Sequence, residues 1–370
     1  MSKIKHLLGI SGGKDSAALA IFMQDKMPNI DVEYYTCDTG RELDDTYKLI
    51  ERLEVYLGKN ILKLTTVDSI EEIPFDYFLK VNGNYLPSSS ARWCTGKLKL
   101  EPFEKHIGDD QVISYVGIRG DEEREGYISK KETIQSIFPF RKCIWSEDVV
   151  KAVLQNSNIT LLNEYANDLV DKEKLISFKE ILDKKLSLHF SQRQKLNSLL
   201  DLCVVSFNKL VFKYLKEKTD YPVGKLDEFP LIYNKDVIVR ADVFRMLEES
   251  GVGVPNYYKE IEFEHNGETA TYSRSRSGCF FCFFQQKIEW VWLYEQHNDL
   301  FLKAMEYEKD GYNWIQDEPL TDLIKPKRID QIKTNYIKRY KKLKANNNSN
   351  KLSDILLDES EGVGCASCFI

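Results

Sequence analysis

The chain has 370 residues, 30% of them charged and 42% hydrophobic, which is ordinary for a globular protein with a large core in one or two domains. Its formal net charge is only −6, so the overall composition points neither to a nucleic acid nor to a membrane as partner. No apolar run reaches the length of about 20 residues that spans a bilayer. The N-terminus does not resemble a secretory signal, and we expect a cytoplasmic protein.

The first 120 residues alternate between strand and helix patterns. We expect strands at 6–10, 31–40, 61–67 and 111–123, with helices at 15–27 and 42–58. This alternation predicts the α/β class, with a twisted parallel sheet and helices on both of its faces. Ligands of such sheets gather at the carboxyl ends of the strands, so the loops after the first, second and fourth strands are the expected site.

The remaining sequence predicts further regions. We divide the chain into a nucleotide-binding α/β domain (1–150), a helical insertion (151–228), a remainder of the first domain with a CxxC pair (229–324) and a C-terminal region (325–370). Residues 325–351 hold ten Lys or Arg against one acid, a net charge of +9. The acidic residues 352–370 follow a stretch rich in Asn and Ser, which predicts a flexible tail.

Eight cysteines are too few for a disulfide scaffold in a chain of this length. In a reducing compartment, clustered cysteines favour metal or redox chemistry and isolated cysteines favour packing. Cys279 and Cys282 form a CxxC pair in RSRSGCFFCFF, and Cys365 and Cys368 form another in GCASCFI. For the first pair, zinc ligation, an iron–sulfur site and simple packing stay open, while the expected compartment disfavours a disulfide.

A glycine loop, GISGGKDSAALA, joins the first strand to the first helix. Gly12 and Gly13 let the backbone approach a ligand closely, and the N–H groups at the helix start attract an anion such as phosphate. Lys14 adds charge, Asp15 can hold a magnesium ion, and two serines add hydroxyl donors. The alternative is a tight turn capped by Ser11 or Asp15.

The hexapeptide SGGKDS resembles the PP-loop of the ATP pyrophosphatases. The lysine in this hexapeptide makes it similar to one branch of these proteins. That branch contains the phosphoadenylyl-sulfate (PAPS) and adenylyl-sulfate (APS) reductases and the sulfurtransferase subunit of DNA phosphorothioation. Further stretches resemble this branch: CDTGRELDDTY (37–47), ARWCTGKLKLEPF (91–103), GIRGDEER (117–124) and FPLIYNKDV through SGCFFC (229–282). The resemblance implies an adenine nucleotide alpha hydrolase-like fold over about 1–150 and 225–310.

The resemblance also implies a site for ATP and Mg²⁺. Phosphate and nucleoside contacts would come from Ser11, Gly12, Gly13, Lys14, Asp15, Ser16, Asp38, Thr39 and Gly40. The implied catalytic residues are Lys14, Asp15, Arg119 and Arg124, with the arginines as counter-charges for phosphate or sulfate oxygens. For these arginines the alternative is surface pairing with neighbouring acidic residues. The implied reaction is adenylation of an acceptor with release of pyrophosphate, after which sulfur replaces the activated oxygen.

In the iron–sulfur members of this branch, the ligands lie in segments that correspond here to Cys94, Cys279 and Cys282. They imply a [4Fe–4S] cluster, with Zn²⁺ as the main rival and packing thiols as the third interpretation. Unlike the APS reductases, this chain has no cysteine beside Cys94. The fourth ligand is therefore open: Cys143 is the first choice, and an iron left open to hold a sulfide is equally admissible. Cys203 is expected to pack.

The leading hypothesis is an adenylating sulfurtransferase that is fed by a cysteine desulfurase and modifies a nucleic acid or serves antiviral defence. The basic segment 325–351 would then meet nucleic acid, unless it is a solvated linker helix. Reduction of APS or PAPS is the enzymatic alternative. A nucleotide-binding sensor or assembly module in a defence complex is the alternative from another class. The tail cysteines, Cys365 and Cys368, would carry sulfur, supply cluster ligands or bind a partner, and the sequence allows an oligomer.

Overall fold

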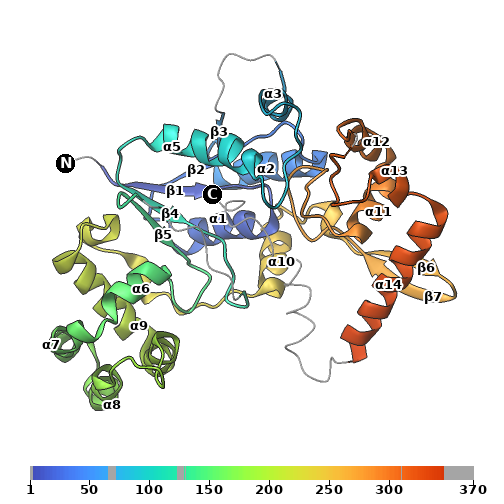
Figure 1. Cartoon of the computed structure of the whole chain (residues 1–370). Helices are drawn as coiled ribbons and strands as arrows, with labels where there is room; N and C mark the ends of the chain where they lie inside the picture. The colour runs from blue at the N-terminus through green and yellow to red at the C-terminus, as the bar shows by residue number, and fades with distance from the viewer. Residues whose placement is uncertain (1–2, 66–71, 123–128, 130, 310, 346–370) are drawn as a thin grey trace.

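A parallel five-stranded sheet, in the strand order β3-β2-β1-β4-β5, forms the centre of the molecule (Figure 1). The computed structural model describes residues 3–65, 72–122, 129, 131–309 and 311–345. The strands are β1 (Lys5–Gly9), β2 (Val32–Cys37), β3 (Leu62–Leu64), β4 (Val112–Tyr115) and β5 (Ile134–Ile137). The predicted parallel α/β sheet is confirmed, although β5 was not expected from the sequence. The predicted flexible tail lies outside the described residues.

Helices cover both faces of the sheet, because side chains alternate between the two faces along each strand. Leu8 of β1 packs into a large core with α1 (Lys14–Lys26) and α2 (Asp44–Leu57). Its neighbour Leu7 packs on the opposite face with α5 (Glu101–Ile107). The prediction of helices on both faces is therefore confirmed.

The strand order creates one crevice at the carboxyl end of β1. From β1 the chain runs outward to β2 and β3 on one side and then crosses to β4 and β5 on the other. Ligands of open parallel sheets bind at such a switch point. The loops after β1 and β4 touch there, since a side chain at Gly117 would come within 2.9 Å of the carbonyl oxygen of Asp15.

Four helices follow β5 between residues 147 and 218, and the division of the chain at 151 and 228 stays a prediction. They are α6 (Glu147–Val153), α7 (Ile159–Leu169), α8 (Lys172–Asp183) and α9 (Gln192–Lys218). The backbone leaves the helical conformation inside α9 at Cys203, with φ of −164° and ψ of 100°. The buried side chain of Lys195 provides hydrogen bonds to carbonyl groups at the end of α8. Its Nζ donates to the carbonyl oxygens of Leu182 and Lys184 at 2.6 and 2.8 Å.

A second core lies beside the sheet and contains the first CxxC pair. Phe281, between the two cysteines, stacks on Trp314 with ring centroids 4.6 Å apart and contacts Phe75 at 4.5 Å. Its elements are α3 (Pro74–Val81), α4 (Trp93–Thr95), β6 (Ile261–His265), β7 (Glu268–Tyr272), α11 (Lys287–Gln296), α12 (Asn298–Glu306), α13 (Leu320–Leu323) and α14 (Pro326–Ala345), together with one π-helical turn at Gly96–Leu100. Helix α10 (Arg240–Glu249) packs instead on α1, since its buried Val243 and Leu247 belong to the first core. Short 3₁₀ turns occur at Asn156–Asn158, Pro222–Lys225, Pro230–Tyr233 and Asn256–Tyr258. None of the helices among the described residues combines the length and the apolar character that a membrane span requires.

Candidate functional site

The glycine loop after β1 has no room for side chains at its centre. Gly12 has a φ of 72°, in the left-handed region that favours glycine, and a Cβ there would lie 2.1 Å from Cγ2 of Thr46. A Cβ on Gly13 would lie 2.8 Å from Oγ of Ser277. Helix α2 and the segment before the CxxC pair therefore enclose the loop from two sides, and both approaches depend on the absence of a side chain.

Two consecutive tyrosines hold the loop from the second core. The hydroxyl of Tyr257 donates to the carbonyl oxygen of Gly12 at 2.9 Å. The hydroxyl of Tyr258 accepts from the amide of Lys14 at 3.5 Å, and the Lys14 ammonium lies 5.0 Å from the centroid of the same ring. Sequence reasoning missed both tyrosines, although they end the PNYY motif of the stretch that resembles the family.

Helix α1 begins after Gly13 without a side-chain cap. Neither Ser11 nor Asp15 therefore caps the helix, and the capped turn considered as an alternative is not formed. Ser16 instead binds within the loop, since its Oγ donates to the carbonyl oxygen of Gly13 at 3.1 Å and accepts from the amide of Ser11 at 3.2 Å. The positive end of α1 remains directed at the crevice.

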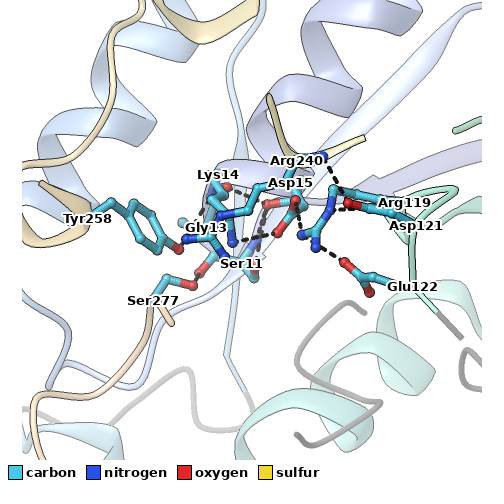
Figure 2. A network of polar contacts seen from close by, with 12 residues as sticks. Ser11, Gly13, Lys14, Asp15, Arg119, Asp121, Glu122, Arg240, Tyr258 and Ser277 are labelled. Atoms are coloured by element: carbon cyan, nitrogen blue, oxygen red, sulfur yellow. Dashed lines mark hydrogen bonds and ion pairs between the residues drawn. The ribbon is translucent and has the colours of Figure 1, made fainter. Parts of the chain in front are cut away.

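A buried network of charges joins α1 to the loop after β4 (Figure 2). Asp15 pairs with Lys14 at 3.2 Å and with Nη1 of Arg119 at 3.0 Å. Arg119 is 0% exposed and also pairs with Asp121 at 2.9 Å and Glu122 at 2.8 Å. The neighbour pairing expected as the alternative for Arg119 is thus present, but this guanidinium also contacts the PP-loop. The other predicted arginine, Arg124, lies outside the described residues.

The network keeps Asp15 ionised. Burial alone would raise the pKa of Asp15, but the charges and hydrogen bonds of Lys14 and Arg119 lower this pKa to about 2. With three carboxylates against two cations, the five side chains carry a net negative charge at neutral pH.

The loop after β2 brings its predicted residues close to the glycine loop. Asp38 accepts hydrogen bonds from the amide of Gly40 at 2.7 Å and from the hydroxyl of Tyr47 at 2.9 Å. Thr39 donates to Glu42 at 2.7 Å. Burial and then the charge of Asp38 raise the pKa of Glu42. Sequence reasoning missed Glu42 and Tyr47, because their partners become visible only when the loop is folded.

A cavity of about 200 Å³ lies between these loops and is lined by Ser11, Asp38, Glu42, Thr46 and Tyr47. Typical pockets for a whole small molecule measure about 300–1,000 Å³. This cavity can therefore take part of a nucleotide and would have to widen for a complete one.

The CxxC pair reaches the same loops. Sγ of Cys279 lies 3.2 Å from Oγ1 of Thr39, and the Cys279 backbone forms a β-bridge with Glu42. Burial and then the charge of Glu42 raise the pKa of the Cys279 thiol well above its usual range. The amide of Cys282 donates to the carbonyl oxygen of Cys279 at 3.1 Å, which closes the turn. Cys94 packs against the same core, so the structure brings these three cysteines to one side of the molecule.

Cys143 lies elsewhere. It packs against the core beneath the sheet, and its thiol donates to the carbonyl oxygen of Trp145 at 3.7 Å. The structure does not bring Cys143 together with Cys94, Cys279 and Cys282. Within the described part of the chain, no group of three or more Cys, His, Asp or Glu side chains is arranged to hold a metal ion. The metal ligand set stays a prediction.

A buried arginine next to the CxxC pair has no counter-charge among the described residues. Arg274 is 1% exposed, and its Nη2 donates to the carbonyl oxygen of Cys279 at 3.1 Å. Its Nε and Nη1 are buried and have no hydrogen-bond partner, and the guanidinium makes no ion pair among the residues that the structure describes. A buried charge without a counter-charge is costly, so this position fits an anionic group that binds beside the cysteines.

The comparisons with known proteins each cover less than half of the chain. Residues 5–168 match the family model of the phosphoadenosine phosphosulfate reductase domain, which supports a nucleotide-binding enzyme of the PP-loop class. An uncharacterized protein of Methanocaldococcus jannaschii is 32% identical over 151 residues, 37% of this chain and 30% of that protein. An uncharacterized nin region protein of Escherichia phage lambda is 29% identical over 146 residues, 32% of this chain and 49% of that protein. The chain therefore spans between 30% and 49% of the lengths of these relatives.

The substitution Gly12→Ala tests the enclosed loop. The left-handed backbone costs alanine about 1–2 kcal/mol, and the contact with Thr46 adds about 1–3 kcal/mol. Gly58→Ala is the matched control, since Gly58 also has a positive φ (60°) but no atom within 4 Å of a Cβ. We expect a lower thermal midpoint for Gly12→Ala than for Gly58→Ala, and weaker ATP binding by calorimetry for Gly12→Ala alone. Equal losses in the two variants would contradict the steric argument.

The pH dependence of Asp15→Asn tests the buried network. Because the folded-state pKa of Asp15 is lowered, its ionised form stabilises the fold at pH values above the ordinary aspartate pKa, and this contribution is lost as the pH falls towards 2. Wild type should exceed Asp15→Asn by about 2 kcal/mol in free energy of unfolding at neutral pH. The difference should shrink as the pH falls from about 5 towards 2. Denaturant unfolding across this range measures it, with the exposed Asp109→Asn as control, and a pH-independent difference would argue against the charge network.

Proposed function

Residues 5–168 belong to the phosphoadenosine phosphosulfate reductase domain family, and on this premise we propose an adenylating enzyme that supports sulfur transfer. In the proposed reaction, an acceptor oxygen attacks the α-phosphorus of ATP and pyrophosphate leaves. A sulfide then replaces the activated oxygen, and AMP leaves. Acceptors of this class include the bases and backbone of nucleic acids. A cysteine desulfurase is the proposed source of sulfur, which it supplies as a persulfide; a second thiol reduces the persulfide by two electrons, which releases sulfide and leaves a disulfide.

The observation that carries this proposal is that the PP-loop and the CxxC segment lie next to each other. Ser277 lies against Gly13 in the loop, and Cys279 contacts Thr39 after the neighbouring strand. A phosphate held by the loop and a sulfur species held by the cysteines would therefore lie within one crevice. Nucleotide binding alone would not require thiols at this position.

The residues around the glycine loop suit a nucleotide that binds as its magnesium complex. The positive end of α1 and Lys14 favour phosphate oxygens, and these contacts can stabilise the departing pyrophosphate. Three carboxylates surround Arg119 in this network, and a triphosphate would lie close to them. Carboxylates such as Asp15 or Asp38 could hold Mg²⁺ together with the phosphates, and the ion would neutralise part of their charge.

The residues around the cysteines fit an anionic iron–sulfur group. Cys94, Cys279 and Cys282 are the proposed ligands, and a bound cluster would supply a site for sulfide or for electrons. Arg274 supports this proposal, because its unpartnered donors could contact sulfur atoms and offset thiolate charge. Cys143 lies in the other core, so the proposal has either an open iron or a ligand from outside the described residues.

The substitution Lys14→Met tests the nucleotide site. Protein purified without oxygen is given ATP and Mg²⁺, and ATP binding and pyrophosphate release are measured with and without single-stranded DNA or RNA. Removal of a buried ammonium from phosphate should weaken ATP binding by at least about tenfold. Lys26→Met, at the exposed other end of α1, is the control and should bind ATP like wild type.

The same protein is tested in parallel with APS and PAPS. Sulfite release without ATP consumption would refute adenylation and favour the reductase alternative. ATP binding without either activity would favour the sensor alternative.

The cluster is tested by metal content rather than by activity. We expect iron, acid-labile sulfide and brown colour in wild type, loss of all three in Cys94→Ser, and retention in Cys203→Ser, which lies at the interruption of α9. Arg274→Met, which keeps the side-chain bulk without the charge, should lower iron per chain while the thermal midpoint of the metal-free protein stays equal or rises. Colourless wild type that contains zinc would contradict the iron–sulfur proposal.

A further inference from the structure

A large groove runs from the segment after the CxxC pair to helix α14, which lies along the β6–β7 hairpin in Figure 1. Its volume is about 1,270 Å³, above the range of about 300–1,000 Å³ that is typical of pockets for single small molecules. Its walls are formed by four segments: 85–91, 283–288, 311–317 and one face of α14. An extended ligand fits such a groove better than a compact one.

The groove is lined by aromatic rings that are not fully buried in a core. Tyr85 and Tyr312 are 53% and 45% exposed and meet edge to face at 4.7 Å. The ring of Phe284, two residues after Cys282, contacts two guanidinium groups, with its centroid 5.1 Å from Arg92 and 5.5 Å from Arg276. Exposed rings combined with arginine planes form stacking surfaces for unpaired bases.

The charge of α14 suits a polyanion. Residues 326–345 hold eight Lys or Arg and a single acid, Asp330. The helix packs through its apolar residues Ile332 and Ile337, so the positive charge is not needed for that packing. Three of the basic side chains do pair with neighbouring acids: Arg328 with Glu318, Lys333 with Glu295 and Lys341 with Glu268.

Two further basic side chains of α14 are exposed to solvent, outside the residues that line the groove. Lys327 and Lys338 are exposed and make no ion pair among the described residues. Arg339 is exposed and lines the groove with Asn335 and Tyr336 of the same helix face. On the α14 wall the groove is lined by the basic residues Arg328 and Arg339, and exposed tyrosines line its other walls. Cationic groups and aromatic rings are the two features that bind a single strand.

The geometry points to a binding surface for single-stranded nucleic acid, whose backbone follows α14 and whose bases stack on the exposed rings of Tyr85 and Tyr312. The groove ends at the residues that follow Cys282, so a base at that end would lie next to the cysteines. An acidic polypeptide would satisfy the charges of α14 but would leave the exposed rings without partners. Binding of the strand stands on these observations alone, and only its role as the sulfur acceptor rests on the proposed function.

Fluorescence anisotropy with the full chain tests the surface. The probes are fluorescein-labelled mixed-sequence strands of about 12 nucleotides, one of DNA and one of RNA, and the corresponding DNA duplex. We expect the single strands to bind more tightly than the duplex. Tyr85→Ala and Tyr312→Ala should each weaken binding by about tenfold. Tyr233→Ala is the matched control. Tyr233 is 60% exposed and its ring contacts the Lys209 ammonium, so it resembles the groove tyrosines in exposure, but it lies outside the groove.

The dependence of affinity on salt tests the backbone contacts. Lys327→Gln and Lys338→Gln should each reduce the slope of log affinity against log salt by about 1, while the exposed Lys185→Gln should leave the slope unchanged. A duplex that binds as tightly as the single strands, or tyrosine variants that bind like Tyr233→Ala, would overturn the proposal. Polyglutamate that binds as tightly as the strands at equal charge would also overturn it, and would identify an acidic protein as the partner. ATP binding is measured on the same samples, so failure of the groove is distinguished from failure of the nucleotide site.

Discussion

The site depends on one close contact between distant parts of the chain. Gly12 and Gly13 leave no room for side chains because Thr46 of α2 and Ser277 of the CxxC segment pack directly on them. Tyr257 fixes the same loop by a hydrogen bond to its backbone. The shape of the loop is therefore set by the second core as much as by the sheet that precedes it. A change that loosens the second core should alter the loop before it alters the sheet.

Two buried arginines near this contact differ in how their charges are balanced. Arg119 has three carboxylate partners. Their attraction offsets much of the free-energy cost of removing its guanidinium from water. Arg274 has one carbonyl oxygen as its acceptor. The guanidinium of Arg119 thus has counter-charges within the described chain, whereas that of Arg274 would gain one from the anionic group that we propose beside the cysteines.

The sequence predicted what depends on local pattern and missed what depends on distant contacts. The first strands and helices follow from alternation and helical periodicity, and the structure contains them near the expected residues. Strand β5 was missed because its short pattern is interrupted by Gln135, whose buried side chain accepts a hydrogen bond from the amide of Val223. The tyrosines that hold the loop lie more than 240 residues from it in the sequence. Cys143 was expected beside the other cysteines because spacing cannot tell which of two cores a residue joins.

The order in which the chain leaves the ribosome gives the enclosed loop a further consequence. The glycine loop and most of the sheet emerge first and can fold early, as N-terminal units generally do. Tyr257 and Ser277 emerge more than 240 residues later, and until then the loop lacks two of its supports. A chain released before that point would hold the phosphate-binding sequence in an incomplete form. The phosphate-binding loop would therefore reach its final shape only after the second core has folded.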